Sequence, residues 1–121
     1  FGRRDKRIGR EDMMNAVKQD VEKLVQKELE SADQKFPVFH SDYEGAAVIL
    51  REIDNAKLQM VRTKERFENV WSFVKYESHR EELTLDLKHC AIELACSAIQ
   101  IAAMAQKFID SQKEREKSEQ L

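Results

Sequence analysis

Residues 82–110 carry two parallel stripes of side chains at helical spacing. A polar stripe runs one position before an apolar one, at Glu82, Asp86, His89, Glu93, Ser97 and Gln100. The apolar stripe recurs every three or four positions, at Leu83, Leu87, Cys90, Leu94, Ala98, Ile101, Ala105 and Phe108. This spacing places each stripe along one side of a single helix. The bordering carboxylates are therefore either a hydrated helix edge or half of an acidic site between helices.

The N-terminal half of the chain predicts two further helices. The first spans about residues 11–31, where apolar residues share one face. The second spans about residues 41–62. Ser41 and Glu44 have the spacing of a capping box, which predicts the start of this second helix.

Residues 63–76 are again helical by their spacing. They either continue the second helix or begin a separate helix near Thr63. Ser78 and Glu81 repeat the capping pattern and predict the start of the final helix. Three large apolar residues share one face of this segment and are expected to lie in the core: Phe67, Trp71 and Val74.

Together these helices predict an all-α fold, an antiparallel bundle of about four helices. The chain of 121 residues has only three glycines and one proline, and neither type occurs after Gly45. A sheet would need more turn residues. The final helix has further apolar residues off its main stripe, at Ile92, Ile99 and Met104. A second subunit would cover them, so we expect a homo-oligomer, either a dimer or a tetramer.

The charge distribution divides the chain into three parts. Residues 1–10 hold five basic residues against one acidic residue and are expected to form a disordered arm. Residues 11–110 are the single helical domain, and residues 111–121 are a polar tail. The net charge of −2 argues neither for nor against nucleic-acid binding. Because no aromatic residues lie between the arginines, binding of nucleic acid through residues 3–10 is only a third, weaker alternative.

The remaining composition points to the cytoplasm. No apolar run approaches the roughly 20 residues of a membrane span, so no membrane contact is expected. Nothing resembles a signal peptide. Cys90 and Cys96 lie six residues apart on one predicted helix and point in different directions, which is typical of free thiols in a reducing compartment.

Carboxylates on helices are the main candidates for chemistry. No phosphate-binding glycine loop, nucleophile elbow or zinc-binding HExxH sequence occurs. Paired carboxylates on two neighbouring helices can hold Mg²⁺, a hard cation that takes oxygen ligands and bridges to phosphates.

Three segments resemble the MazG-like family of all-α nucleoside triphosphate pyrophosphohydrolases, in particular its small phage and prophage members. They are residues 44–56, with the sequence EGAAVILREIDNA, residues 67–74, and residues 98–105, with the sequence AIQIAAMA. The resemblance covers roughly residues 36–110. It implies a helical bundle that oligomerises, requires Mg²⁺ (or Mn²⁺), and cleaves a nucleoside or deoxynucleoside triphosphate to a monophosphate and pyrophosphate.

The resemblance also implies a site. The family's EExxE pattern falls on residues 51–55, where Glu52 is retained, Arg51 replaces a ligand and Asn55 offers a neutral oxygen. On the final helix, Asp86 and Glu93 are the second pair, and Ser97 stands where many relatives have glutamate. The implied catalytic residues are Glu52 and Glu93, and the implied metal ligands are Glu52, Asn55, Asp86 and Glu93. So few carboxylates would bind metal weakly, which would impair catalysis.

Other interpretations remain open. Glu52 would equally suit a solvated helix position, and Asp86 and Glu93 would suit a hydrated edge that holds His89 between them. Lys57 and Lys88 would be available for phosphates, although nothing selects them over other lysines. The main alternative function is a non-catalytic, phage-derived helical bundle that binds a protein partner through its extra apolar faces.

Overall fold

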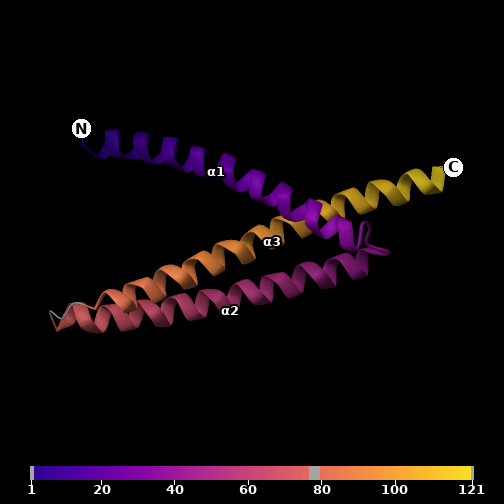
Figure 1. The fold of residues 1–121 in the computed structure, drawn as a ribbon. Coiled ribbons are helices and arrows are strands. Elements are labelled where there is room, and N and C mark those ends of the chain that lie inside the picture. The colour runs from indigo at the N-terminus through magenta and orange to yellow at the C-terminus, as the bar shows by residue number, and fades with distance from the viewer. Residues whose placement is uncertain (1, 77–79, 121) are drawn as a thin grey trace.

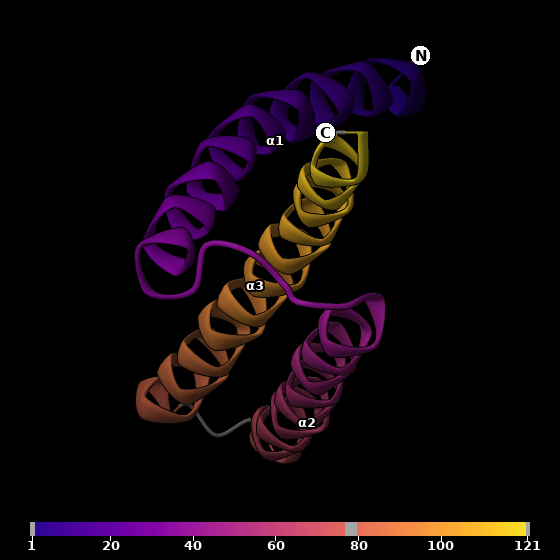
Figure 2. The ribbon, with the colours of Figure 1, turned by 90° about the vertical axis from the view of Figure 1, so that its right-hand side faces the viewer.

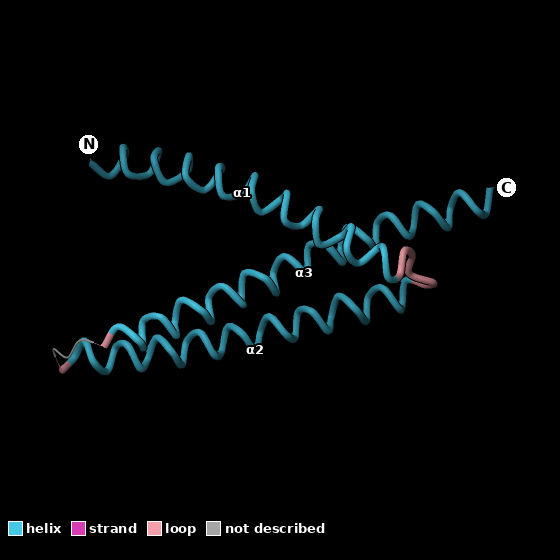
Figure 3. The backbone as a smooth tube through the Cα atoms, viewed as in Figure 1, coloured by secondary structure: helices cyan, strands magenta, loops and turns pink. Residues whose placement is uncertain are grey.

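The computed structural model describes residues 2–76 and 80–120, and within them the side chains of residues 16–76 and 80–119. It has three long helices: α1 (Gly2–Lys35), α2 (Asp42–Lys75) and α3 (Glu81–Gln120). Figure 3 shows that helices make up almost all of this part of the chain, and it contains no strand. The predicted all-α fold is therefore confirmed, with three helices in these residues where about four were expected.

The continuity of α2 explains the smaller number of helices. Thr63 Oγ1 donates a hydrogen bond to the carbonyl oxygen of Gln59 at 2.8 Å. This local bond satisfies the hydroxyl within the helix, so Thr63 does not end it. No glycine or proline is available after Gly45 to break the helix. The second and third predicted helices are thus one helix.

The three helices form a long antiparallel pair that α1 crosses. α2 and α3 lie side by side, and α1 crosses α3 at an angle near one end of the pair (Figure 1). The view along the helices shows α1 on the far side of α3 from α2 (Figure 2). Among the described residues, close backbone approaches join α3 to both other helices but do not join α1 to α2. α3 is therefore the central helix.

The core is small and lies at the crossing. It contains Leu29 of α1, Phe39 of the connection between α1 and α2, and Ala103 and Met104 of α3. Ala103 is fully buried, and its small side chain allows α1 to approach α3 closely. Half-buried apolar residues from all three helices surround this cluster: Val25, Ala32, Val48, Ile49 and Phe108.

The predicted apolar stripe of the final helix is mostly covered. Ala98 and Ala105 are exposed, and the six larger members are half-buried: Leu83, Leu87, Cys90, Leu94, Ile101 and Phe108. Because α2 runs along α3, this face forms the seam between them. Ser78, the predicted cap of this helix, lies outside the described residues.

Both predicted terminal segments continue helices. Residues 2–10 lie within α1, and residues 111–120 lie within α3. Ser111 is buried and Arg115 is half-buried. The packed part of the chain therefore extends beyond residue 110, at least to Arg115.

The end of the α2–α3 pair away from α1 leaves apolar side chains uncovered. Phe67, Trp71 and Val74 are between 50% and 56% exposed, so the prediction that they lie in the core is wrong for the single chain. Leu85 and Ile92 of α3 are also exposed. These five are called the distal apolar residues below.

α3 is long and apolar enough, by length and composition alone, to cross a membrane. The sequence pattern predicted no apolar run of this length. Only a small part of the apolar stretch is buried in the single chain. The central helix of a packed protein meets the same two criteria, so they do not assign α3 to a membrane.

Candidate functional site

A groove of about 460 Å³ lies beside the core, where the three helices meet. Small-molecule sites in proteins commonly have volumes of about 300–1,000 Å³. The groove combines apolar side chains with three carboxylates and three cationic groups. It is lined by Glu28, Ser31, Ala32, Lys35, Phe36, Phe39, Glu44, Val48, Arg51, Glu52, Gln100, Met104 and Lys107.

The charged side chains divide the groove into two ends. Gln100 and Lys107 lie two turns apart on α3, which separates their backbones by about 10 Å. Glu28 bonds Gln100 at one end, and Lys35, seven residues after Glu28, ends α1 near the connection. One end therefore carries the carboxylates of Glu28 and Glu52, with the Arg51 guanidinium at its rim. The other carries the amines of Lys35 and Lys107 together with the carboxylate of Glu44, which accepts a hydrogen bond from the His40 N–H.

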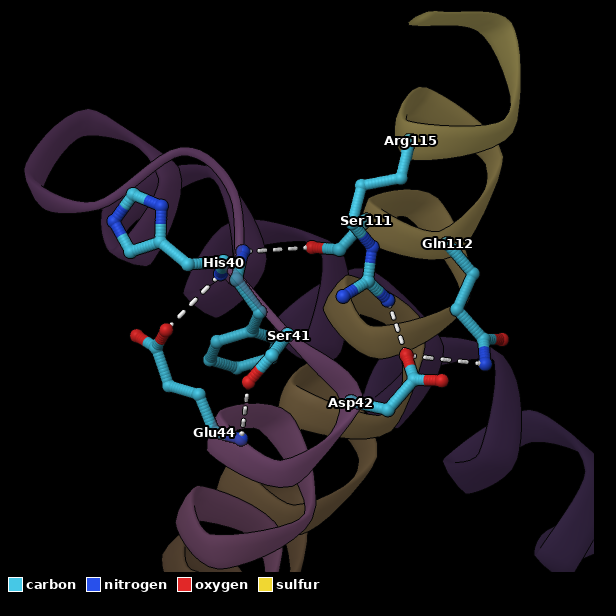
Figure 4. A network of polar contacts seen from close by, with 8 residues as sticks. His40, Ser41, Asp42, Glu44, Ser111, Gln112 and Arg115 are labelled. Carbon is cyan, nitrogen blue, oxygen red and sulfur yellow. Dashed lines mark hydrogen bonds and ion pairs between the residues drawn. The ribbon is translucent and has the colours of Figure 1, made fainter. Parts of the chain in front are cut away.

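The connection between α1 and α2 is fixed by backbone hydrogen bonds at the amine end of the groove. The buried backbone N–H of Phe39 donates to Ser111 Oγ of α3 at 2.9 Å. The N–H of His40 donates to Glu44 Oε2 at 3.0 Å, and the N–H of Glu44 donates to Ser41 Oγ at 3.1 Å (Figure 4). Ser41 is thus the N-cap that the sequence predicts, whereas the Glu44 side chain bonds the N–H of the residue before the cap, and not that of Ser41 as in a standard capping box.

Next to this cap, the first turn of α2 is held to the end of α3. Asp42 Oδ1 accepts hydrogen bonds from Arg115 and from Gln112 Nε2, the latter at 3.4 Å (Figure 4). Both pairs join residues about seventy positions apart in the chain. They therefore help to fix how α2 begins relative to α3, and so where the groove closes.

Gly45 lets α2 and α3 approach each other at this level. A Cβ atom on Gly45 would lie 2.5 Å from Cδ2 of Phe108 and 3.1 Å from Cδ2 of Phe39. Carbon atoms in contact normally lie about 3.5–4.0 Å apart. The missing side chain therefore allows both aromatic rings to pack against the helix backbone.

The carboxylate end of the groove joins α1 to α3. Gln100 Nε2 donates to Glu28 Oε1 at 2.6 Å in a partly buried hydrogen bond. Glu52 Oε1 lies 3.6 Å from Arg51 Nε. The Glu52 side chain is only 16% exposed, whereas that of Arg51 is 70% exposed. Glu52 thus faces the interior of the groove, and its ion pair lies at the rim, where such pairs contribute little stability.

Lys107 is the most buried ionisable side chain in the groove. It is 4% exposed, and its Nζ lies 4.7 Å from the centroid of the Phe39 ring. No hydrogen bond or ion pair joins its ammonium to another described residue. The ammonium therefore has an aromatic face as its neighbour but no counter-ion from the described part of the chain.

The structure brings only one of the four implied site residues into the groove. Glu52 lines it, and Asn55, Asp86 and Glu93 do not. Gly45 faces Phe108, so in the antiparallel pair Glu52 lies opposite a point near residue 101. Glu93 is then displaced by about 12 Å along α3, and Asp86 by about 22 Å. Both are exposed.

The described residues contain no converging group of three histidine, cysteine, aspartate or glutamate side chains that could hold a metal ion. Lys57 and Lys88, the lysines considered for phosphates, are exposed and lie outside the groove.

The polar stripe of α3 contained a signal for the residues that do line the groove. Continued at the same spacing, it passes through Gln100, Met104 and Lys107, which line the groove, to Ser111, which does not. Its N-terminal members are exposed, Gln100 is half-buried, and Lys107 and Ser111 are buried. The stripe is thus a hydrated edge in its first half and enters the packed region in its second half. Glu28 had no comparable signal, because it occupies an ordinary charged position on α1.

Comparison with protein-family models, with curated proteins and with solved structures finds no match for this chain.

Proposed function

We propose that the groove binds a nucleoside triphosphate with Mg²⁺ and that the protein hydrolyses it to a monophosphate and pyrophosphate. The observation that carries this proposal is that the groove holds the carboxylates of Glu28 and Glu52 at one end and the amines of Lys35 and Lys107 at the other, beside the hydrogen-bonded carboxylate of Glu44, with apolar and aromatic side chains between them. Such a ligand needs oxygen ligands for its metal, cations for its phosphates and an apolar surface for its base. The resemblance of residues 44–56 and 98–105 to the MazG-like family agrees with this proposal.

The carboxylates of the groove suit a metal that arrives with its substrate. Mg²⁺ is usually held by one or two carboxylates and by substrate phosphates, and it keeps several waters. Glu52 is one such carboxylate, since no hydrogen bond within the described residues engages it and its ion pair is long. Glu28 is a second, because Gln100 occupies only one of its oxygens. The described residues hold no preformed group of three ligands, and this mode of binding does not require one.

In the proposed reaction, the oxygen of a water molecule attacks the α-phosphorus. A new bond forms between phosphorus and this oxygen, and the bond from phosphorus to the oxygen shared with the β-phosphate breaks. Pyrophosphate leaves with that oxygen, and the proton released by the water is accepted by the Glu52 carboxylate or by solvent. Mg²⁺, when bound, neutralises phosphate charge and makes a bound water more acidic. The chain itself orients the triphosphate along the groove.

Product analysis tests this proposal. The purified protein is incubated with each ribonucleotide and deoxynucleotide triphosphate in Mg²⁺ and separately in Mn²⁺, and monophosphate and pyrophosphate are measured. We expect pyrophosphate from at least one nucleotide, with a loss of more than 100-fold in Glu52→Gln, in the range of losses for charge-stabilising groups. Glu65→Gln, an exposed carboxylate elsewhere on α2, is the matched control. Hydrolysis that Glu52→Gln retains would contradict the proposal.

We further propose that a second copy of the chain covers the distal apolar residues. Leu85, Ile92 and Ile99 lie seven residues apart and so share one face of α3, and α1 covers that face only near Ala103. Ile99 is half-buried, whereas Ile92 and Leu85 are 49% and 43% exposed. Exposed contiguous apolar surface commonly marks an interaction site.

The distal apolar residues also favour the second candidate function, a non-catalytic module that binds another protein. In that case Phe67, Trp71 and Val74 would be the contact residues, since aromatic residues are enriched at interfaces. Absence of hydrolysis together with capture of a different protein at this end would favour this function over the enzyme.

A further inference from the structure

We infer that Lys107 forms an anion subsite at the amine end of the groove and that this subsite takes the pyrophosphate portion of the ligand. The subsite is defined by the Lys107 ammonium, the Phe39 ring beneath it and the Lys35 amine at the same end, where the Glu44 carboxylate also lies with one oxygen bonded to the His40 N–H. That the anion belongs to a nucleotide rests on the proposed function. The presence of an anion subsite does not.

The Lys107 side chain is mostly buried in the wall of the groove, with 4% of the residue exposed. Lysine commonly buries its aliphatic stem and keeps its ammonium accessible, and the Lys107 ammonium is not among the buried unpartnered side-chain atoms of the described residues. It lies over the Phe39 ring, and no hydrogen bond or ion pair within the described residues engages it. A cation over a phenyl ring gains some electrostatic energy, but the ring accepts no conventional hydrogen bond. The ammonium therefore retains donors for a ligand.

The neighbouring carboxylates do not explain Lys107. Glu44 Oε2 accepts a hydrogen bond from the His40 backbone, and Glu28 Oε1 accepts one from Gln100 at the other end of the groove. Neither carboxylate lies within ion-pair distance of Lys107. Lys35, by contrast, has an ordinary structural reason for its position, because a basic residue in the last turn of a helix is stabilised by the helix dipole.

The position of Lys107 also gives the ligand an orientation. Its backbone lies about 10 Å along α3 from that of Gln100, which bonds Glu28 at the carboxylate end. A nucleoside triphosphate laid along the groove would place its β- and γ-phosphates at Lys107, and its α-phosphate nearer to Glu52. The leaving pyrophosphate would then remain bound to Lys107 as the bond to the α-phosphate breaks.

Binding of inorganic pyrophosphate, without nucleotide, tests the subsite. Titration calorimetry is carried out on the whole chain as wild type, Lys107→Met, Lys107→Arg and Lys113→Met. Lys113 is an exposed lysine on the same helix and serves as the matched control. We expect pyrophosphate affinity to fall at least tenfold in Lys107→Met, to be largely kept in Lys107→Arg and to stay within twofold in Lys113→Met. Circular dichroism and the melting temperature check that each variant is folded.

Three results would overturn the inference. They are no pyrophosphate binding by the wild type, unchanged affinity in Lys107→Met, or an equal loss in Lys113→Met, which would indicate unspecific attraction between charges. If Lys107→Met does not fold, wild type with ¹³C-labelled lysines is titrated instead. The Cε resonance assigned to Lys107 with the help of Lys107→Arg must then shift with pyrophosphate, and an unshifted resonance would overturn the subsite.

The outcomes for the subsite and for the enzyme are separable. Pyrophosphate binding that depends on Lys107, in a protein that hydrolyses no nucleotide, would support the subsite and contradict the proposed function. Hydrolysis that depends on Glu52, with pyrophosphate affinity independent of Lys107, would support the proposed function and overturn the subsite. Succinate serves as a further arm, because Lys107-dependent binding of this dicarboxylate but not of pyrophosphate would overturn the assignment to phosphate.

Discussion

At the scale of single residues, the groove depends on two contacts that draw α3 toward its neighbours. Gly45 lets the Phe108 ring lie against the backbone of α2. Ser111 accepts the buried N–H of Phe39 and so holds the connection against α3. The stripe of α3 reaches Ser111 in the sequence, but its hydrogen-bond partner could not be predicted. Residue 111 opens a polar segment that reads as a tail, and its partner lies 72 positions earlier in the chain.

Gly45→Ala is expected to destabilise the protein. In an unobstructed helix this change stabilises by about 0.5–1 kcal/mol. Here the added Cβ would lie 2.5 Å from the Phe108 ring, and the forced repacking should cost about 1–3 kcal/mol. Urea denaturation measures the effect. Phe108→Leu in the Gly45→Ala background should recover part of the loss, and a stabilised single variant would contradict the packing described.

Ser111→Ala is expected to lower the free energy of unfolding by about 1–3 kcal/mol, because the buried Phe39 N–H would lose the acceptor that it has among the described residues. Ser118→Ala is the matched control, since Ser118 is exposed and its hydroxyl bonds only the Glu114 carbonyl of its own helix. The control should stay within about 0.5 kcal/mol of wild type. Equal stabilities of the two variants in urea denaturation would exclude the proposed role of Ser111.

At the scale of helices, local sequence patterns predicted where the helices lie in the chain better than they predicted how many helices there are. The spacing of Ser41 and Glu44 marked the start of α2, where Ser41 caps the helix and the Glu44 side chain bonds the N–H of His40. The stripe from Leu83 to Phe108 marked the packed face of α3. Whether a helix ended near Thr63 could not be decided, because threonine is compatible with a helix interior and with a boundary.

Ser41→Ala should cost about 1 kcal/mol, the usual effect of loss of an N-cap side chain. Ser41 Oγ accepts the Glu44 N–H at 3.1 Å at the start of α2. Ser72→Ala, in the middle of the same helix and exposed, should change stability by less than about 0.5 kcal/mol. The stabilities of the two variants are compared by thermal and urea unfolding. If Ser41→Ala were as stable as Ser72→Ala, the capping role of Ser41 would be contradicted.

At the scale of the whole molecule, the sequence pattern predicts helices but not which faces meet. Phe67, Trp71 and Val74 have core-like spacing, yet α1 crosses the other end of the pair and leaves them exposed. Glu52 reaches the groove, but Glu93 does not, because the register of α2 against α3 separates them. Register depends on contacts such as Gly45 with Phe108, which no local pattern specifies.

The exposed distal end predicts self-association. Light scattering should give a mass that is a multiple of the 14.2 kDa chain, corresponding to a dimer or a tetramer. Ile92→Glu places a charge on the uncovered face of α3 and should shift the mass toward one chain. Glu30→Gln, an exposed change on α1, is the control. A monomeric wild type at micromolar concentration would contradict this part of the account.

The most direct test of the central claim, that the groove is a nucleotide site, is the affinity for a nucleoside triphosphate analogue with an imido bridge between its α- and β-phosphates. Such an analogue resists cleavage at that bond, so binding is measured even where catalysis is weak. In Mg²⁺, we expect the wild type and Glu65→Gln to bind alike, and both Glu52→Gln and Lys107→Met to bind at least tenfold more weakly. Equal affinities across all four proteins, or no binding to any of them, would contradict the assignment of the groove.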